Sequence, residues 1–239
     1  MHLNISHPIL IRPLQSITRT TAGIFTLLIL LTTACSKKEP AGPSTSNVGP
    51  QMPETSDNTI PAAPTTEKIK FKKPGGTTAF SLKFKIDGLK LMDGNEQEIA
   101  RINFTENGKY KAKDSADKTL AYVTGNAPKF QIKDATQKET LFTFQKQEDG
   151  DWKLEGSEEK LICKIGKRDY GWKIEDGAEK QLGKVKAEDG RISIRDQNDE
   201  ELFYTNDPLP SMTAIPFALP QLSQPQAAAL SAALSKSTQ

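Results

Sequence analysis

The sequence is dominated by a unit of about 20 residues that occurs six times between residues 89 and 207. Four positions after each start stands an Asp, except in the fourth unit, which has Gly156. A second apolar pair follows ten or eleven residues after each start. A fixed period of this length is typical of proteins built from stacked supersecondary units. The units start at Leu89, Tyr110, Phe130, Trp152, Trp172 and Ile192.

Each unit has the pattern of a β-hairpin. The start residue and the residue two positions later share one face of a strand, with a mostly polar residue between them. Turn dipeptides such as Asn107-Gly108 and Asp189-Gly190 separate the units. Upstream, residues 80–86 alternate apolar and polar side chains, with Phe80, Leu82, Phe84 and Ile86 on the predicted buried face.

These patterns predict a mainly β fold of about 12–13 antiparallel strands, from six hairpins and the 80–86 strand. An open sheet of this size would leave two unpaired edges, so we predict a closed barrel. The repeat domain spans residues 68–207.

The C-terminal tail, residues 208–239, is poor in charge, and residues 208–235 carry none. Ser223 and Gln226 match a capping box, and the following residues 227–234 are Ala, Leu and Ser. This short helix is apolar on nearly every side, so we expect it inside the barrel or against it. The alternative is a frayed, Ala-rich tail.

Residues 1–34 have the features of a targeting segment: Arg12, Arg19, no acidic residue and an apolar run at 22–31. The sequence Thr32-Thr33-Ala34-Cys35 follows and resembles the lipobox of bacterial lipoproteins. The resemblance implies cleavage before Cys35, a diacylglyceryl thioether on it, and an acyl chain such as palmitate on its amino group. It also implies membrane attachment in the bacterial cell envelope. Ser36 resembles the outer-membrane sorting signal of enterobacteria.

The alternative for this segment is an ordinary signal peptide with a chance Cys after it. Residues 36–67 contain six prolines among Ser, Thr, Asn and Gly, a composition that cannot form a packed core. We therefore expect residues 35–67 to be a disordered tether that carries the lipid.

Composition excludes several function classes. The only histidines, His2 and His7, lie in the leader, so the remaining chain has no His for a catalytic triad or a metal site. After residue 35, 30 Lys and Arg balance 30 Asp and Glu, which argues against nucleic-acid binding. We predict no catalytic residues, no metal and no cofactor. A glycosidase with two carboxylates is the enzyme alternative.

Three sets of repeat residues have two interpretations each. The Asp at each fourth position either caps a turn or belongs to a calcium ladder. Cys163 is either a small buried residue or a reactive thiol. The aromatic starts are either core residues or an exposed ladder that stacks on sugars or peptide, and they are the weak candidates for ligand binding: Tyr110, Phe130, Trp152 and Trp172.

The repeats also resemble a known class of barrels. The residues 130–134 (Phe-Gln-Ile-Lys-Asp) and 172–177 (Trp-Lys-Ile-Glu-Asp-Gly), with the late apolar segment, look like those of tubby, LURP-one and phospholipid-scramblase proteins. The resemblance implies twelve strands around a hydrophobic C-terminal helix. It transfers no functional residue to this chain.

The leading functional hypothesis is a non-enzymatic envelope lipoprotein whose barrel is a binding or structural module. Its partner would be an envelope protein, a lipid or a cell-wall polymer, in addition to the membrane reached through Cys35. One alternative is a barrel that carries an apolar ligand such as a lipid in its lumen. The other is a carbohydrate- or cell-wall-binding array on the aromatic column.

Overall fold

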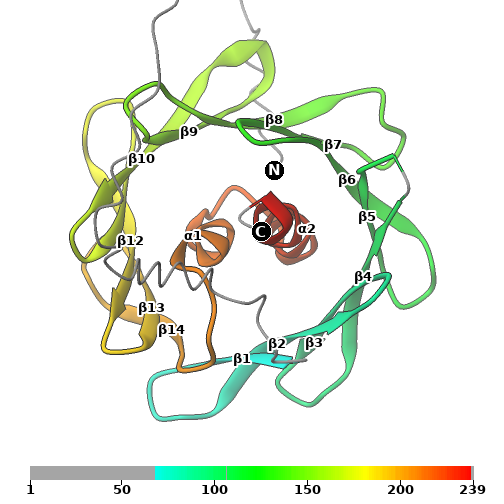
Figure 1. Cartoon of the computed structure of the whole chain (residues 1–239), viewed down its shortest axis with the longest axis horizontal. Helices are drawn as coiled ribbons and strands as arrows, with labels where there is room; N and C mark the ends of the chain where they lie inside the picture. Colours follow the sequence, from blue (N-terminus) through cyan, green and yellow to red (C-terminus); the bar gives the residue numbers. More distant parts are fainter. Residues whose placement is uncertain (1–67, 106, 238–239) are drawn as a thin grey trace, which may run out of the picture. The chain divides into compact units, whose positions relative to one another are not determined.

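The computed structural model of the protein describes residues 68–105 and 107–237. Within them, 14 antiparallel strands form one closed barrel, in which each strand pairs with its sequence neighbours and β1 pairs with β14 (Figure 1). The mainly β, closed antiparallel fold is confirmed. The strands are β1 (Lys68–Lys72), β2 (Thr78–Lys85), β3 (Gly88–Asp93), β4 (Glu98–Phe104), β5 (Tyr110–Lys113), β6 (Thr119–Asn126), β7 (Lys129–Lys133), β8 (Thr140–Lys146), β9 (Trp152–Glu155), β10 (Leu161–Arg168), β11 (Gly171–Glu175), β12 (Gln181–Glu188), β13 (Arg191–Arg195) and β14 (Glu201–Thr205).

The barrel has one hairpin more than the six units found from the spacing. β1 and β2 form it, and Ile69 and Phe71 stand 20 residues before the equivalent residues of the next unit. Lys73 occupies the place of the Asp, but its amide donates to the Thr77 carbonyl at 2.8 Å, as in the next turn. This degenerate seventh unit explains the 14 strands, where about 12–13 were predicted.

Ile86 is not on the buried face where the alternation placed it. β2 ends at Lys85, which pairs with Gly88, so Ile86 and Asp87 are the two central residues of the turn to β3. The Ile86 side chain is 103% exposed. Side chains at the centre of a two-residue turn point away from both strands, so the strand periodicity does not extend to residue 86.

Each of the seven hairpins has a register shift at the same repeat position, consistent with one β-bulge. The joints between units have none. In five of the six units found from the spacing, the second apolar pair has a spacing of three residues, which strict alternation would place on opposite faces; the shifts explain this spacing. A bulge bends and twists its hairpin, so one per unit curves the sheet towards closure. The extra residues are Ala79, Ile99, Leu120, Leu141, Ile162, Leu182 and Leu202.

The C-terminal segment fills the lumen (Figure 1). It contains α1 (Ser211–Ala214), a 3-10 turn η2 (Ile215–Ala218) and α2 (Gln224–Ser237). α1 and η2 pack against β12 and β13, whereas α2 packs against β3–β7. Residues 227–235 of α2 are all buried. The predicted helix is therefore present, and its apolar surface is enclosed on every side. We call residues 208–237 the plug.

The barrel has two different ends. The turns between units lie at one end, the joint end, and the turns within units lie at the other, the Asp end. Lys68 pairs with Lys83 close to the β2–β3 turn, so β1 begins towards the joint end. Lys236 and Ser237 lie beside the β6–β7 turn, so α2 also ends there. The plug therefore enters the lumen and returns to the same end.

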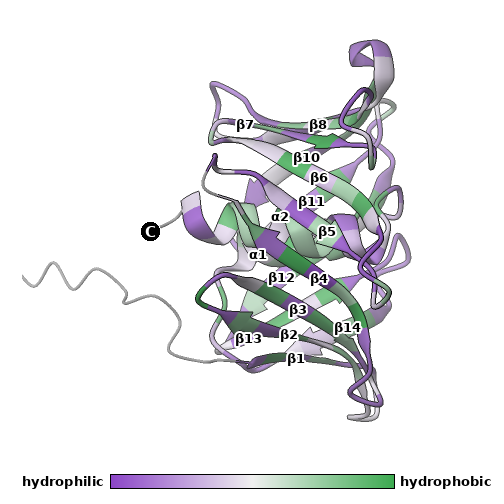
Figure 2. Ribbon diagram, turned by 90° about the vertical axis from the view of Figure 1, so that its right-hand side faces the viewer, coloured by the Kyte–Doolittle hydropathy of each residue, from purple (hydrophilic) through white to green (hydrophobic). Residues whose placement is uncertain are grey.

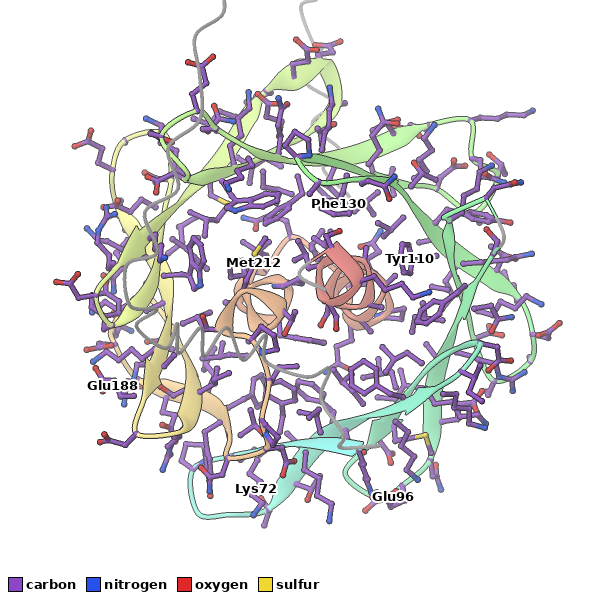
Figure 3. All side chains as sticks on the ribbon, viewed as in Figure 1. Lys72, Glu96, Tyr110, Phe130, Glu188 and Met212 are labelled. Carbon is purple, nitrogen blue, oxygen red and sulfur yellow. The ribbon has the colours of Figure 1, made fainter. Side chains whose placement is uncertain are left out.

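The two faces of the barrel wall differ in chemistry. Alternation along the strands is visible in Figure 2, and Figure 3 shows Tyr110 and Phe130 pointing inward while Lys72, Glu96 and Glu188 project outward. The lumenal residues form one apolar core with the plug. A barrel that faces lipid has an apolar outer band and a polar interior. This wall has the reverse arrangement.

Candidate functional site

The four aromatic candidates all face the lumen. Their exposed fractions are 6% for Tyr110, 1% for Phe130, 3% for Trp152 and 8% for Trp172. Rings buried to this extent have no face left for a sugar or peptide outside the barrel. The exposed stacking ladder is therefore wrong, and the interpretation of these residues as core is correct.

The aromatic column makes ring contacts within the wall and a hydrogen bond to the plug. The Trp152 ring stacks on Phe144, with ring centroids 4.8 Å apart, and on Phe130 at 6.3 Å. Trp172 Nε1 donates a hydrogen bond to Ser211 Oγ at the start of α1, over 3.1 Å. A buried indole N–H needs such an acceptor, so this bond fixes where the plug meets the wall.

The Asp column lies in the turns at the Asp end. In each of the five units that carry it, the Asp carboxylate accepts backbone N–H bonds from residues two and four or five positions later. This is the turn-capping geometry. Among the described residues, no group of three or more His, Cys, Asp or Glu side chains has a metal-binding arrangement. The five residues are Asp93, Asp114, Asp134, Asp176 and Asp196.

Asp176→Ala is expected to lower the free energy of unfolding by about 1–2 kcal/mol, because the Ala178 and Lys180 amides lose their acceptor. Asp176→Asn keeps the acceptor oxygen and should lose less. Urea unfolding gives both values. The control is Asp169→Ala, since the exposed Asp169 carboxylate makes no side-chain bond among the described residues, and it should change stability by less than about 0.5 kcal/mol. Equal losses for Asp169→Ala and Asp176→Ala would contradict the capping role.

Cys163 has the environment of a core residue. Its exposed fraction is 0%, and burial raises the pKa of its thiol to about 12. The thiolate is the reactive form of cysteine, so both observations favour the inert interpretation.

A thiol reagent added to the folded protein at pH 8 is expected to leave Cys163 unmodified, because access and ionisation are both suppressed. Urea should make the same thiol react at the ordinary rate. Mass spectrometry of peptides containing Cys163 measures both states. Rapid labelling without urea would show that the core opens near β10.

The outer face has an asymmetry of charge. Residues 68–113 carry 11 Lys and Arg against 5 Asp and Glu, a net charge of +6, whereas residues 114–207 carry 16 against 21, a net charge of −5. The first group covers β1–β5, one side of the ring in Figure 1. We call its outward-facing cations the basic wall: Lys68, Lys70, Lys72, Lys83, Lys85, Lys90, Arg101, Lys111 and Lys113.

A surface hollow of about 380 Å³ lies in the basic wall at the joint end. Lys85, Lys90 and Arg101 line it, together with Asp87 and Asn103. The turn that carries Ile86 lies directly beside this hollow, because residues 85, 87 and 88 all contribute to the lining.

Neither the basic wall nor the Ile86 turn follows from the repeat columns. The total charge after residue 35 is balanced, and each Lys of the wall looks like an ordinary solvated residue within its own unit. A running sum of charge along the chain would have found the wall, since the sum rises to residue 113 and falls afterwards.

The predictions for the N-terminal segment, including Cys35 as the lipidated residue, concern positions outside the described residues. Within residues 68–105 and 107–237, no helix is long and apolar enough to cross a membrane.

No protein-family model matches this sequence, and a search of curated proteins found no match either.

Proposed function

We propose that this chain is a lipid-anchored protein of the bacterial cell envelope, attached through Cys35, and that its barrel is a non-enzymatic module acting through its outer face. The anchor rests on the lipobox-like residues 32–35 after an apolar run. The role of the barrel rests on one observation: its own C-terminal segment occupies the lumen. Outer-membrane attachment belongs to the same proposal and rests on Ser36 alone.

The plug argues against the lipid-carrier alternative. Leu230 and Leu234 are fully buried between the barrel wall and the rest of the plug. An apolar ligand of any size would have to displace α2, and the displaced helix would expose its apolar residues to water. Burial of these side chains is the main favourable term in folding, so displacement is strongly opposed.

The same architecture favours a relationship with the tubby, LURP-one and scramblase class, whose resemblance implies a barrel around an apolar C-terminal helix. The present barrel has 14 strands rather than twelve. The relationship therefore stays part of the proposal, and the functional argument does not depend on it.

The anchor is tested by expressing the whole chain in a Gram-negative host with radiolabelled palmitate. The wild-type chain should take up label and sediment with membranes, because acyl chains contribute about 0.8 kcal/mol per buried methylene. Cys35→Ser should remain unlabelled. An inhibitor of lipoprotein signal peptidase should cause a larger precursor to accumulate.

Cys163→Ala is the matched control, since two other units have Ala at this repeat position, Ala100 and Ala121. It should keep the label and the membrane fraction of the wild type. A labelled Cys35→Ser protein, or an unlabelled wild type, would overturn the lipoprotein assignment.

A further inference from the structure

The edge of the basic wall at the joint end combines an apolar side chain with a basic surface. Ile86 is the most exposed large hydrophobic residue within the described part of the chain, and it projects from the tip of the β2–β3 turn. Lys85 precedes it, and the hollow lined by Lys85, Lys90 and Arg101 adjoins it. An exposed apolar tip with cations around it fits the boundary between lipid headgroups and acyl chains.

We propose that this edge is a docking surface for an anionic lipid bilayer, into which Ile86 inserts while the adjacent hollow takes a phosphate-bearing headgroup. The docking deepens the proposed function and rests on it for the identity of the membrane, because the anchor at Cys35 would hold the barrel beside a bilayer. The contact itself is made by the barrel wall.

The charges of the wall point to a bilayer rather than to an acidic protein. The wall contains eight Lys and one Arg. Lys is depleted at protein interfaces, where Arg and aromatic residues dominate. Lys clusters instead bind anionic bilayers by a diffuse attraction that needs no fixed geometry. A Lys-rich surface with a single apolar tip therefore fits a lipid surface better than a protein pocket.

Part of this positive charge is available to a partner. Lys70, Lys72, Lys85 and Lys111 of the wall form no ion pair within the described residues. Other wall cations are neutralised at the surface, and Lys68 and Lys83 both bind Glu96, which lowers the pKa of its carboxyl to about 2.

The hollow is partly neutralised as well. Glu98 pairs with Lys90 over 2.5 Å and with Arg101 over 2.9 Å, and Asp87 also lines the hollow. The hollow would therefore accommodate a headgroup but would not bind it through several strong ion pairs. The attraction comes from the whole wall, and Ile86 sets the orientation.

The topology places the wall correctly for this role. β1 begins towards the joint end, so the segment that precedes Lys68 joins the barrel on the side that carries Ile86. A membrane anchor upstream of β1 and the proposed docking edge would then act on the same bilayer.

A single probe position tests the contact directly. In the full chain carrying Cys35→Ser and Cys163→Ala, an environment-sensitive fluorophore is attached at Ile86→Cys. The control probe is attached at Asp169→Cys, which occupies the same place in the β10–β11 turn, because Arg168 pairs with Gly171 as Lys85 pairs with Gly88. Circular dichroism confirms that both variants fold.

With phosphatidylglycerol vesicles, the probe at 86 should shift to the blue and the probe at 169 should stay in water. Phosphatidylcholine vesicles should give no shift at either position, and excess inorganic phosphate should not compete. Equal shifts at both positions, no shift at 86, or an equal shift at 86 with phosphatidylcholine would each overturn the docking surface.

Charge reversal provides the second measurement. Lys70→Glu with Lys85→Glu should weaken binding to phosphatidylglycerol vesicles at least tenfold, since each Lys near an anionic surface strengthens binding about fivefold. Lys164→Glu with Lys167→Glu, exposed and outside the wall, should change it less than about twofold. Equal weakening by both pairs would refute a localised surface.

The leader and the tether are identical in all these variants, so a difference between positions or pairs belongs to the barrel. If the wild-type chain takes up no palmitate but the probe at 86 shifts to the blue, the lipid anchor is refuted and the docking surface is retained. If the wild-type chain takes up palmitate but the probe at 86 shows no shift, only the docking surface is refuted.

Discussion

Leu230→Asp is expected to unfold the barrel, lowering the free energy of unfolding by more than about 4 kcal/mol. Leu230 is 0% exposed at the centre of α2, among apolar side chains of the plug and the wall. An ionised carboxylate placed there loses its hydration, so it must either become protonated or expel the helix. Leu230→Ala removes only apolar contacts and should cost about 2–5 kcal/mol.

Urea unfolding followed by tryptophan fluorescence measures these losses, because Trp152 and Trp172 both line the lumen. Gln224→Asp is the control, since Gln224 is exposed at the first residue of α2 and should change stability by less than about 0.5 kcal/mol. A Leu230→Asp protein with the wild-type unfolding midpoint would show that α2 does not occupy the lumen in solution.

Phe80→Ala is expected to cost about 3–5 kcal/mol. Its ring is the centre of an aromatic cluster and lies 4.6 Å from Phe71, 4.9 Å from Phe217 and 5.4 Å from Phe203, measured between centroids. Phe71 belongs to β1, Phe203 to β14 and Phe217 to the plug. The cluster therefore joins the two strands that close the barrel to the segment that fills it.

The backbone contributes less at this closure. The ladder between β1 and β14 has one registered pair, Lys72 with Tyr204, and the Lys70 amide donates to Asp207 Oδ2 over 2.6 Å. Loss of the cluster should therefore open the β1–β14 seam before the rest of the wall.

Hydrogen exchange of the β1 amides in Phe80→Ala, compared with the β6–β7 amides, measures this local opening. Leu202→Ala is the control, because Leu202 is 42% exposed at its bulge and should change stability by less than about 0.5 kcal/mol. Uniform acceleration of exchange around the whole barrel would mean that the seam has no separate weakness.

The fold was predictable because the repeat carries a redundant signal. Six copies of one pattern, together with the problem of unpaired edges, determine an antiparallel barrel, and the apolar helix needs an enclosed place. The seventh hairpin was missed in part because Lys73 stands at the position where five of the other six units carry Asp. The sequence did not determine whether the aromatic column faces inward or outward. A period of two separates the two faces of a strand, but it does not show which of them is buried.

The candidate surface was less predictable than the fold. The position of Ile86 depends on where β2 ends, and strand ends are poorly determined by alternation. The basic wall is a run of net positive charge within residues 68–113, and the repeat columns hide it because each Lys looks like an ordinary solvated residue of its own unit.

Because each hairpin contains its own bulge, the number of hairpins in this protein can change by whole units. Each unit contains its own turn, its own bulge and its own pair of strands, so duplication or loss of a whole unit keeps the pairing of every other unit. The circumference would nevertheless change by two strands, and the diameter of a barrel grows with strand number. A plug of 30 residues fits only one diameter. The number of repeats and the size of the C-terminal segment must therefore evolve together.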